Sequence, residues 1–275
     1  MFLPSTILFS APPSLFVKTM SALNLVLHAN AGYSEMTGKQ HMKYSKFWND
    51  EKSTMNGKEK EKKKKKEEIK ISSRNGMLFL YTPAFLAGLA SFWLFPEEGL
   101  RFLLLSSALT FHFFKRIFEV LFIHKYSGGM TLDSAIVISL SYFSITATMI
   151  YTQHLSQGLP EPTIDSKFFG LILFLLGVSG NFYHHCLLSK MRRNGEKEYK
   201  IPTGGLFDKV ICPHYLFEIL GFWGIFFIAQ TWYSFCCALG TTFYLVGRSC
   251  ATRNWYFSKL EDFPKHVKAI FPYVL

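Results

Sequence analysis

Residues 77–95 read MLFLYTPAFLAGLASFWLF, an apolar run without a single charged side chain. A second run of this kind, SAIVISLSYFSITATMIYT, covers residues 134–152. A helix that crosses the hydrocarbon core of a bilayer needs about 20 mostly apolar residues. These two stretches therefore predict membrane-spanning helices, and they decide the fold class: an all-α integral membrane protein.

The composition of the whole chain agrees with this assignment. The 275 residues are 49% hydrophobic and 17% aromatic, yet the net charge is +11, a combination that is unusual for a soluble domain. The alternative of a soluble bundle of buried core helices is disfavoured, because few amphipathic polar faces are present to cover such a core.

Four more segments look membranous but are shorter or carry polar residues: 102–123, 168–189, 210–230 and 231–247. Ionisable groups at membrane depth are costly and usually face a protein interior or a wet cavity. Together with residues 5–33 at the amino end, these segments predict a seven-transmembrane-helix bundle with a polar interior.

The amino end leaves an alternative open, because Ala29, Asn30 and Ala31 resemble a signal-peptide cleavage site, and cleavage would leave six helices. Lys and Arg number 13 in residues 31–76, 6 in 190–209 and 5 from Arg248 onward. Basic loops face the cytosol. This pattern places both basic loops and the carboxyl end in the cytosol only if the first segment is retained.

The sequence KEKEKKKKKEEIK at 58–70 is of mixed sign and low complexity, which favours a solvated loop over a nucleic-acid site. We therefore expect no nucleic-acid partner.

The predicted organisation has four parts. They are a first membrane segment (1–33), a Lys-rich cytosolic loop (34–76), spans two to four on the substrate side (77–160), and spans five to seven with their cytosolic loops (161–275).

The third predicted span carries His112, Lys115, Arg116 and Glu119 at helical spacing, so these side chains share one face. Lys115 and Glu119 can pair at i,i+4, which lowers the cost of burying both charges. Two interpretations remain open: a buried ion pair that fixes helix packing, or the polar wall of a cavity.

The fifth and sixth spans add Asn181, His184, His185, Tyr215 and Glu218. A metal site is not expected, because adjacent His184 and His185 point in different directions on a helix and no Glu-x-x-His or His-x-x-x-His spacing accompanies them. The cysteines show no CxxC spacing. A polar ligand site therefore fits these residues better than a metal centre.

Basic residues gather where spans five and seven are predicted to reach the cytosol, and guanidinium groups bind phosphate in a bidentate manner. Gly204 and Gly205 in YKIPTGGLF would let the backbone approach a ligand closely. No G-x-G-x-x-G is present, so a dinucleotide would be held without a Rossmann fold. The basic residues are Arg192, Arg193, Lys200, Arg248 and Arg253.

Six motifs carry a family resemblance. They are GN (180–181), LLSKMRRNGE (187–196), YKIPTGGLF (199–207), CPHYLFE (212–218), GRSCATRNWY (247–256) and FPKHVKAIFPYVL (263–275). In this order they resemble the carboxyl-terminal domain of the steroid 5α-reductase family, membrane enzymes that use NADPH to saturate a carbon–carbon double bond conjugated to a carbonyl. Upstream, HFFKRIFEVLFIHKYSGGM at 112–130 is similar to the very-long-chain trans-2-enoyl-CoA reductase branch of that family.

The resemblance implies an NADPH site on the cytosolic side. His185 stands where steroid-reducing members have aspartate, Lys200 where they have arginine, and His214 where they have asparagine. The implied cofactor-binding positions are Asn181, His185, Arg192, Lys200, His214, Glu218, Arg248 and Tyr256, to which we add the glycine pair Gly204 and Gly205.

The resemblance is divided on the substrate. Steroid-reducing members hold a 3-oxo group with glutamate and tyrosine, and Tyr81 and Phe113 stand at those positions. The enoyl-CoA branch instead implicates a tyrosine at Tyr215 with the Lys115 and Glu119 pair, all of which are present.

Reduction of such a double bond develops negative charge on the carbonyl oxygen, so the site must supply a hydrogen-bond donor there. Tyr81, Tyr215 and Lys115 are the candidate donors, Glu119 is expected to orient Lys115, and His112 to support the pair. A protonated tyrosine can also deliver the proton.

The sequence thus predicts an oxidoreductase that acts on a CH–CH group with NADPH. We expect a lipid substrate, a 3-oxo-4-ene steroid in preference to a trans-2-enoyl-CoA. A membrane methyltransferase and an inactive scaffold are more remote alternatives. We expect the protein in the endoplasmic reticulum membrane with a cytosolic carboxyl end, in association with other lipid enzymes there.

Overall fold

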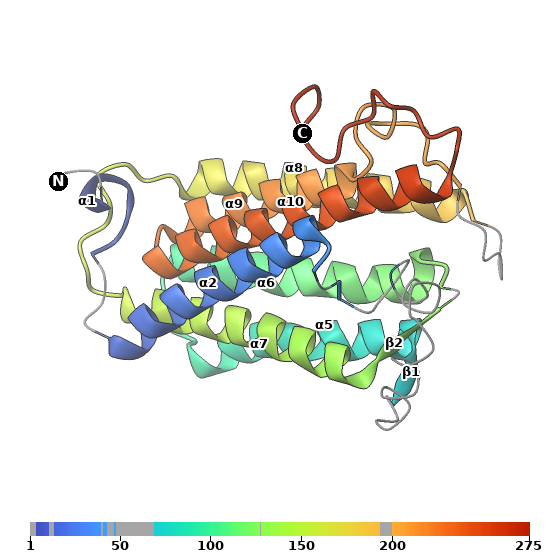
Figure 1. The fold of residues 1–275 in the computed structure, drawn as a ribbon. Coiled ribbons are helices and arrows are strands. Elements are labelled where there is room, and N and C mark those ends of the chain that lie inside the picture. Colours follow the sequence, from blue (N-terminus) through green and yellow to red (C-terminus); the bar gives the residue numbers. More distant parts are fainter. Residues whose placement is uncertain are drawn as a thin grey trace.

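The structure is a computed structural model that describes residues 4–10, 14–39, 41–42, 47, 69–126, 128–192 and 200–275. Within these residues seven long helices run side by side (Figure 1), and a short helix α1 precedes them. The helices are α1 (Pro4–Ile7), α2 (Leu15–Thr37), α5 (Ser73–Leu94), α6 (Leu100–Phe118), α7 (Leu132–Leu155), α8 (Lys167–Lys190), α9 (Pro213–Ala229) and α10 (Trp232–Lys259).

Side chains with a capping oxygen start four of the long helices. Ser14, Ser72 and Thr131 each accept a hydrogen bond from a backbone N–H in the first turn of α2, α5 and α7. Thr231 and Ser234 form a reciprocal capping box at the start of α10. Pro213 occupies the first turn of α9, where its missing N–H costs nothing.

The long helices form two layers, α2, α8, α9 and α10 in one and α5, α6 and α7 in the other (Figure 1). Within the first layer α8 and α9 approach very closely. A Cβ atom on Gly177 would lie 2.4 Å from the backbone nitrogen of Gly221, and one on Gly224 would lie 2.4 Å from that of Phe174. Small residues of this kind let membrane helices pack backbone against backbone.

A two-stranded antiparallel sheet joins the starts of α5 and α7. Strand β1 (Lys70–Ser72) pairs with β2 (Gly129–Thr131) in the register Ile71 to Met130. The carboxyl-terminal segment after α10 lies at the same end of the bundle (Figure 1), where Ile211 N donates to Lys268 O. We call this end, with β1, β2 and the carboxyl-terminal segment, the hairpin end.

Arg101 closes the opposite end of the bundle. This buried guanidinium donates to Ile228 O (2.7 Å) and to the side chains of Gln230 (2.9 Å), Glu161 (2.5 Å) and Asp165 (2.7 Å). Hydrogen bonds from Lys167 and the charge of Arg101 lower the pKa of the Asp165 carboxyl, against the effect of its partial burial. These bonds tie α6 to the loop before α8 and to the turn between α9 and α10.

Three helices are long and apolar enough to cross a membrane among the described residues: α5, α7 and α8. α9 is apolar but shorter. The seven long helices match the predicted number of segments, whereas the number that cross the membrane stays a prediction.

Two predicted boundaries differ from the structure. The first segment, expected over 5–33, is a short α1 followed by α2, which continues to Thr37. The last span, expected over 231–247, belongs to α10, which continues to Lys259, and Arg253 in this last part of the helix bonds to Val267 O of the carboxyl-terminal segment. Residues 58–68 of the Lys-rich run and Arg193 lie outside the described residues.

Candidate functional site

A single large cavity of about 1230 Å³ occupies the interior of the described bundle. Its walls come from α2, α5, α7, α8, α9 and α10, from Arg116 on α6, and from the segment between α6 and β2. Cavities for one small ligand usually measure roughly 300–1,000 Å³. This cavity therefore has room for more than one ligand.

Lys115 lies behind the cavity wall and holds two side chains together. Its Nζ donates to Glu119 Oε1 (3.0 Å) and to Asn181 Oδ1. Asn181 in turn donates to His214 O (2.7 Å). The predicted Lys115–Glu119 pair is present. Through Asn181, Lys115 also links α6 to α8 and α9.

Arg116, the next residue along α6, faces the cavity instead. Its Nη2 donates to the hydroxyl of Tyr81 (2.7 Å) and its Nη1 to Glu119 Oε2 (3.0 Å). Tyr81 also lines the cavity, and its ring lies against Tyr142 and Phe113 with centroid distances of 5.6 and 6.4 Å. The guanidinium thus joins a buried carboxylate to a cavity-facing phenol.

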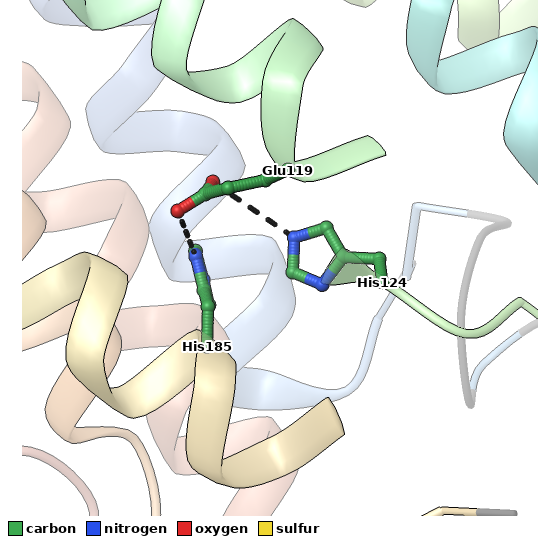
Figure 2. Close-up of side chains that lie close together, drawn as sticks. All are labelled: Glu119, His124 and His185. Carbon is green, nitrogen blue, oxygen red and sulfur yellow. Dashed lines mark hydrogen bonds and ion pairs between the residues drawn. The ribbon is translucent and has the colours of Figure 1, made fainter. Parts of the chain in front are cut away.

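Glu119 begins a π-helical turn, Glu119–Ile123, that continues α6. Such turns are frequent at functional sites. Figure 2 shows the Glu119 carboxylate between His185 and His124, with His185 Nδ1 at 3.0 Å and His124 Nε2 at 3.9 Å. Burial lowers the pKa of the His124 imidazole.

The nitrogens of His124 and His185 and a Glu119 oxygen lie within 4.8 Å of one another, so their positions fit a metal ion. The charges around these three side chains disfavour a metal ion. Lys115 Nζ and Arg116 Nη1 each lie 3.0 Å from a Glu119 oxygen, and two cations at that distance repel a divalent ion. The arrangement is better described as a buried hydrogen-bond network.

Arg248 is the most buried cation at the hairpin end of the cavity. Its side chain is 2% exposed, its Nη1 donates to Glu35 Oε1 (2.6 Å), and its guanidinium lies 4.1 Å from the ring centroid of Phe47. Glu35 also accepts from His41 Nδ1 (2.7 Å) and Met42 N (2.9 Å). The end of α2 is thereby attached to α10 at the cavity wall.

Two more cations, Arg192 and Lys200, line the same end of the cavity. Lys125 Nζ donates to Arg192 O (2.7 Å), so the end of α8 is bonded to the segment that follows the π-helical turn. With Arg248, whose charge is partly compensated by Glu35, these residues make one end of the cavity positive.

The structure brings most of the predicted site residues to the cavity. Lys115, Glu119 and Asn181 lie directly behind the wall. The predicted residues that line the cavity are Tyr81, His185, Arg192, Lys200, His214, Tyr215, Glu218, Arg248 and Tyr256.

His112, Gly204 and Gly205 lie apart from the cavity. His112 packs edge-on against Phe113 and Phe222, with centroid distances of 5.0 and 5.2 Å. Gly204 and Gly205 form a turn with positive φ angles of 85° and 56°, and this turn packs on α8.

His184 holds the glycine turn in place, since Leu206 N donates to its Nε2 (3.2 Å) and its Nδ1 contacts Gly180 O (2.7 Å). Arg253, expected in the basic cluster, donates instead to Val267 O (2.7 Å) and Lys265 O (3.1 Å) of the carboxyl-terminal segment.

The sequence interpretation missed several cavity residues that carry charge or a titratable group, among them Glu35, Arg116, His124 and Lys125. Arg116 belongs to the predicted polar face of the third span, but it is not among the predicted catalytic or cofactor-binding residues. Glu35 gave no local signal, because its partner Arg248 is 213 residues away in the chain.

The sequence model of the family described as "3-oxo-5-alpha-steroid 4-dehydrogenase" matches residues 131–275. A steroid 5-alpha-reductase DET2 from Gossypium hirsutum is 30% identical over 199 residues, which is 67% of this chain and 76% of that protein.

Two other relatives are named for the two predicted substrate classes, enoyl-CoA and steroid. A very-long-chain enoyl-CoA reductase from Dictyostelium discoideum is 32% identical over 60% of this chain and 56% of its own length. A 3-oxo-5-alpha-steroid 4-dehydrogenase 2 from Mus musculus is 29% identical over 66% of this chain and 70% of its own length.

Proposed function

The chain belongs to the 3-oxo-5-alpha-steroid 4-dehydrogenase family of oxidoreductases that act on CH–CH groups, and from this premise we propose that it reduces a carbon–carbon double bond conjugated to a carbonyl in a lipid, with NADPH as the reductant. The family and the apolar helices α5, α7 and α8 together make it an integral membrane protein. The methyltransferase alternative is withdrawn, since the family is one of oxidoreductases.

The observation that carries the proposal is the division of one large cavity into two chemically different regions. The hairpin end carries Arg192, Lys200 and Arg248, whose guanidinium and ammonium groups suit the phosphates of a dinucleotide. The region between α2 and α7 has more apolar side chains in its wall, among them Leu27 and Leu140, with Asn24 and Ser141 as polar members. A cofactor and a lipid can therefore meet in one cavity.

We assign NADPH to the positive region. His185, His214, Glu218 and Tyr256 extend this region along α8, α9 and α10 and add donors and acceptors for the sugar and amide groups of a dinucleotide. Asn181 acts from behind the wall through its bond to His214 O. Bound there, NADPH would supply the hydride, and the protein supplies binding, orientation and a proton.

Catalysis requires a donor at the substrate carbonyl oxygen. Tyr81 and Tyr215 both present hydroxyl-bearing rings to the cavity. Lys115 does not reach the cavity, so its role is indirect: with Glu119 it fixes the α6 wall that carries Arg116. His112 has a packing role in this scheme.

We favour a 3-oxo-4-ene steroid as the substrate. The support is the similarity to a plant protein named for steroid 5-alpha reduction over most of both chains. A trans-2-enoyl-CoA is the second candidate. It is favoured by the relative named very-long-chain enoyl-CoA reductase and by the retained Tyr215, Lys115 and Glu119.

We further propose that the hairpin end faces the cytosol and that the protein resides in the endoplasmic reticulum, near other lipid enzymes. The positive cavity region lies at the hairpin end, and α2 and α8, after which the two basic stretches of the sequence begin, both end there, which agrees with the positive-inside bias. Cytosolic NADPH would then reach its region directly.

A screen of NADPH oxidation separates the two substrate classes. Microsomes from cells that express the protein are given 3-oxo-4-ene steroids, trans-2-enoyl-CoAs of increasing length and polyprenols. Microsomes from untransformed cells are the control. We expect NADPH loss with a steroid enone above the control rate. Oxidation with enoyl-CoA alone would reverse the substrate ranking, and no oxidation with any enone or enoyl thioester would contradict the proposed function.

A further inference from the structure

The hydroxyl of Tyr81 is held by a cation at the cavity wall. Arg116 Nη2 donates to the Tyr81 oxygen at 2.7 Å, and the guanidinium carbon lies 4.9 Å from the centroid of the Tyr81 ring. Both residues line the cavity. Tyr81 is 4% exposed, so water competes little for this bond.

Arg116 is itself held from the other side. Its Nη1 donates to Glu119 Oε2 at 3.0 Å, and Glu119 is completely buried. The carboxylate also accepts from Lys115 and His185, which fixes its position. The guanidinium is therefore immobilised between a fixed anion and the phenol, and its orientation toward Tyr81 is set in advance.

A phenol that accepts a hydrogen bond from a cation is a stronger donor, because the same cation stabilises the phenolate that remains after the proton leaves. At the two positions that the family resemblance implies for holding a carbonyl, this chain has Tyr81 and Phe113. Phe113 has no polar group. A carbonyl at this place would be met by Tyr81 with Arg116 behind it.

We propose that Arg116 is a positioning residue that activates Tyr81, and that the Arg116–Tyr81 pair is the acid that serves the substrate carbonyl oxygen. The proposal rests on the proposed reductase function and identifies which of its candidate donors acts. It assigns a role to Arg116 that neither Lys115 nor His112 fills.

The step balances as follows. As the β-carbon gains the hydride, the electron pair of the C=C bond moves to the bond between the α-carbon and the carbonyl carbon, the π pair of the C=O bond moves to the oxygen, and Tyr81 hands its proton to that oxygen. Arg116 stabilises the phenolate. The α-carbon of the enol then takes a proton from the solvent while the O–H proton returns to Tyr81, so the net addition is one hydride and one proton.

Four variants test the pair: Tyr81→Phe, Arg116→Gln, Arg116→Lys and the double variant Tyr81→Phe/Arg116→Gln. The measurements are kcat and KM on the substrate found for the wild type, and the Kd of NADPH by fluorescence. Removal of one oxyanion donor lowers kcat by about 10²- to 10³-fold. We expect losses of this size for Tyr81→Phe and Arg116→Gln with the NADPH Kd changed less than about threefold.

Two results distinguish activation from a merely structural role. Arg116→Lys should recover part of kcat, because it keeps the cation, and the double variant should be no slower than Tyr81→Phe, because the two residues act as a unit. Tyr151→Phe, the same change at an exposed position of α7, is the matched control and should leave kcat unaltered.

The proposal is overturned if Tyr81→Phe keeps kcat within about threefold of the wild type, or if the losses of the two single variants multiply in the double variant. Tyr81→Phe removes one oxygen only, so this arm stays decisive even if Arg116→Gln fails to fold. Failure of the reductase function itself is seen earlier, as absence of NADPH oxidation by the wild type.

Discussion

Replacing Arg248 with glutamine is expected to weaken NADPH binding by about 100-fold. A hydrogen bond to a charged group contributes about 1.5–3 kcal/mol, and each 1.4 kcal/mol is a factor of ten in Kd. Arg248 is the most deeply buried cation of the positive region, and its guanidinium is fixed between Glu35 and the ring of Phe47. The measurement is a titration of the purified protein in detergent, followed by NADPH fluorescence.

The controls for this variant come from the same helix and the same ion pair. Arg253→Gln changes an arginine one and a half turns further along α10 that bonds to the carboxyl-terminal segment, and it should bind NADPH as the wild type does. Arg248→Gln alone leaves the Glu35 anion buried without its partner, so Glu35→Gln/Arg248→Gln serves as a variant without a stranded charge. An unchanged Kd in a folded double variant would contradict the assignment of this region to the cofactor.

Replacing Glu119 with glutamine is expected to destabilise the fold by about 3–5 kcal/mol, the usual cost of removing one partner of a buried ion pair. The loss is large because the carboxylate compensates both Lys115 and Arg116 and is completely buried. For a chain of this size the melting temperature should fall by about 10 °C. The measurement is thermal unfolding in detergent without cofactor.

Glu161→Gln is the matched control for this change. Glu161 also pairs with an arginine, Arg101, but its side chain is 58% exposed and Asp165 remains as a second partner. Exposed pairs contribute about 0–1 kcal/mol, so this variant should melt close to the wild type. Equal melting temperatures for Glu119→Gln and Glu161→Gln would show that the buried network does not stabilise the fold.

Much of the helical layout could be predicted from the sequence, because apolar runs between charged loops are a strong local signal. The runs at 77–95 and 134–152 lie within α5 and α7. The start of α2 could not be predicted, because the sequence is apolar both before and after the break between α1 and α2. The length of α10 was underestimated because its last turns are polar and pack on protein.

The cavity was predicted only in part. Helical spacing placed Lys115, Arg116 and Glu119 on one broad face, but neighbouring residues differ by about 100° around a helix, and periodicity alone cannot say which cation meets a cavity. The structure directs Arg116 to the cavity and Lys115 to Asn181. The π-helical turn at Glu119 gives no recognisable sequence signal.

Contacts between distant segments account for the remaining differences. Glu35 acquires its place from Arg248 across the α2–α10 interface, and a single sequence does not reveal that pairing. Gly204 and Gly205 were expected beside a ligand because a glycine pair permits close approach. The close approach exists, but Gly205 approaches the ring of His184.

Transfer of deuterium from NADPH that is labelled on the nicotinamide C4 tests the reductase function most directly. The purified protein is incubated with the labelled cofactor and a 3-oxo-4-ene steroid or a trans-2-enoyl-CoA, and the product is examined by mass spectrometry and NMR. We predict a saturated product with deuterium on the β-carbon and a solvent-derived proton on the α-carbon. A folded protein that gives no labelled product from either substrate class would contradict the function proposed for this cavity.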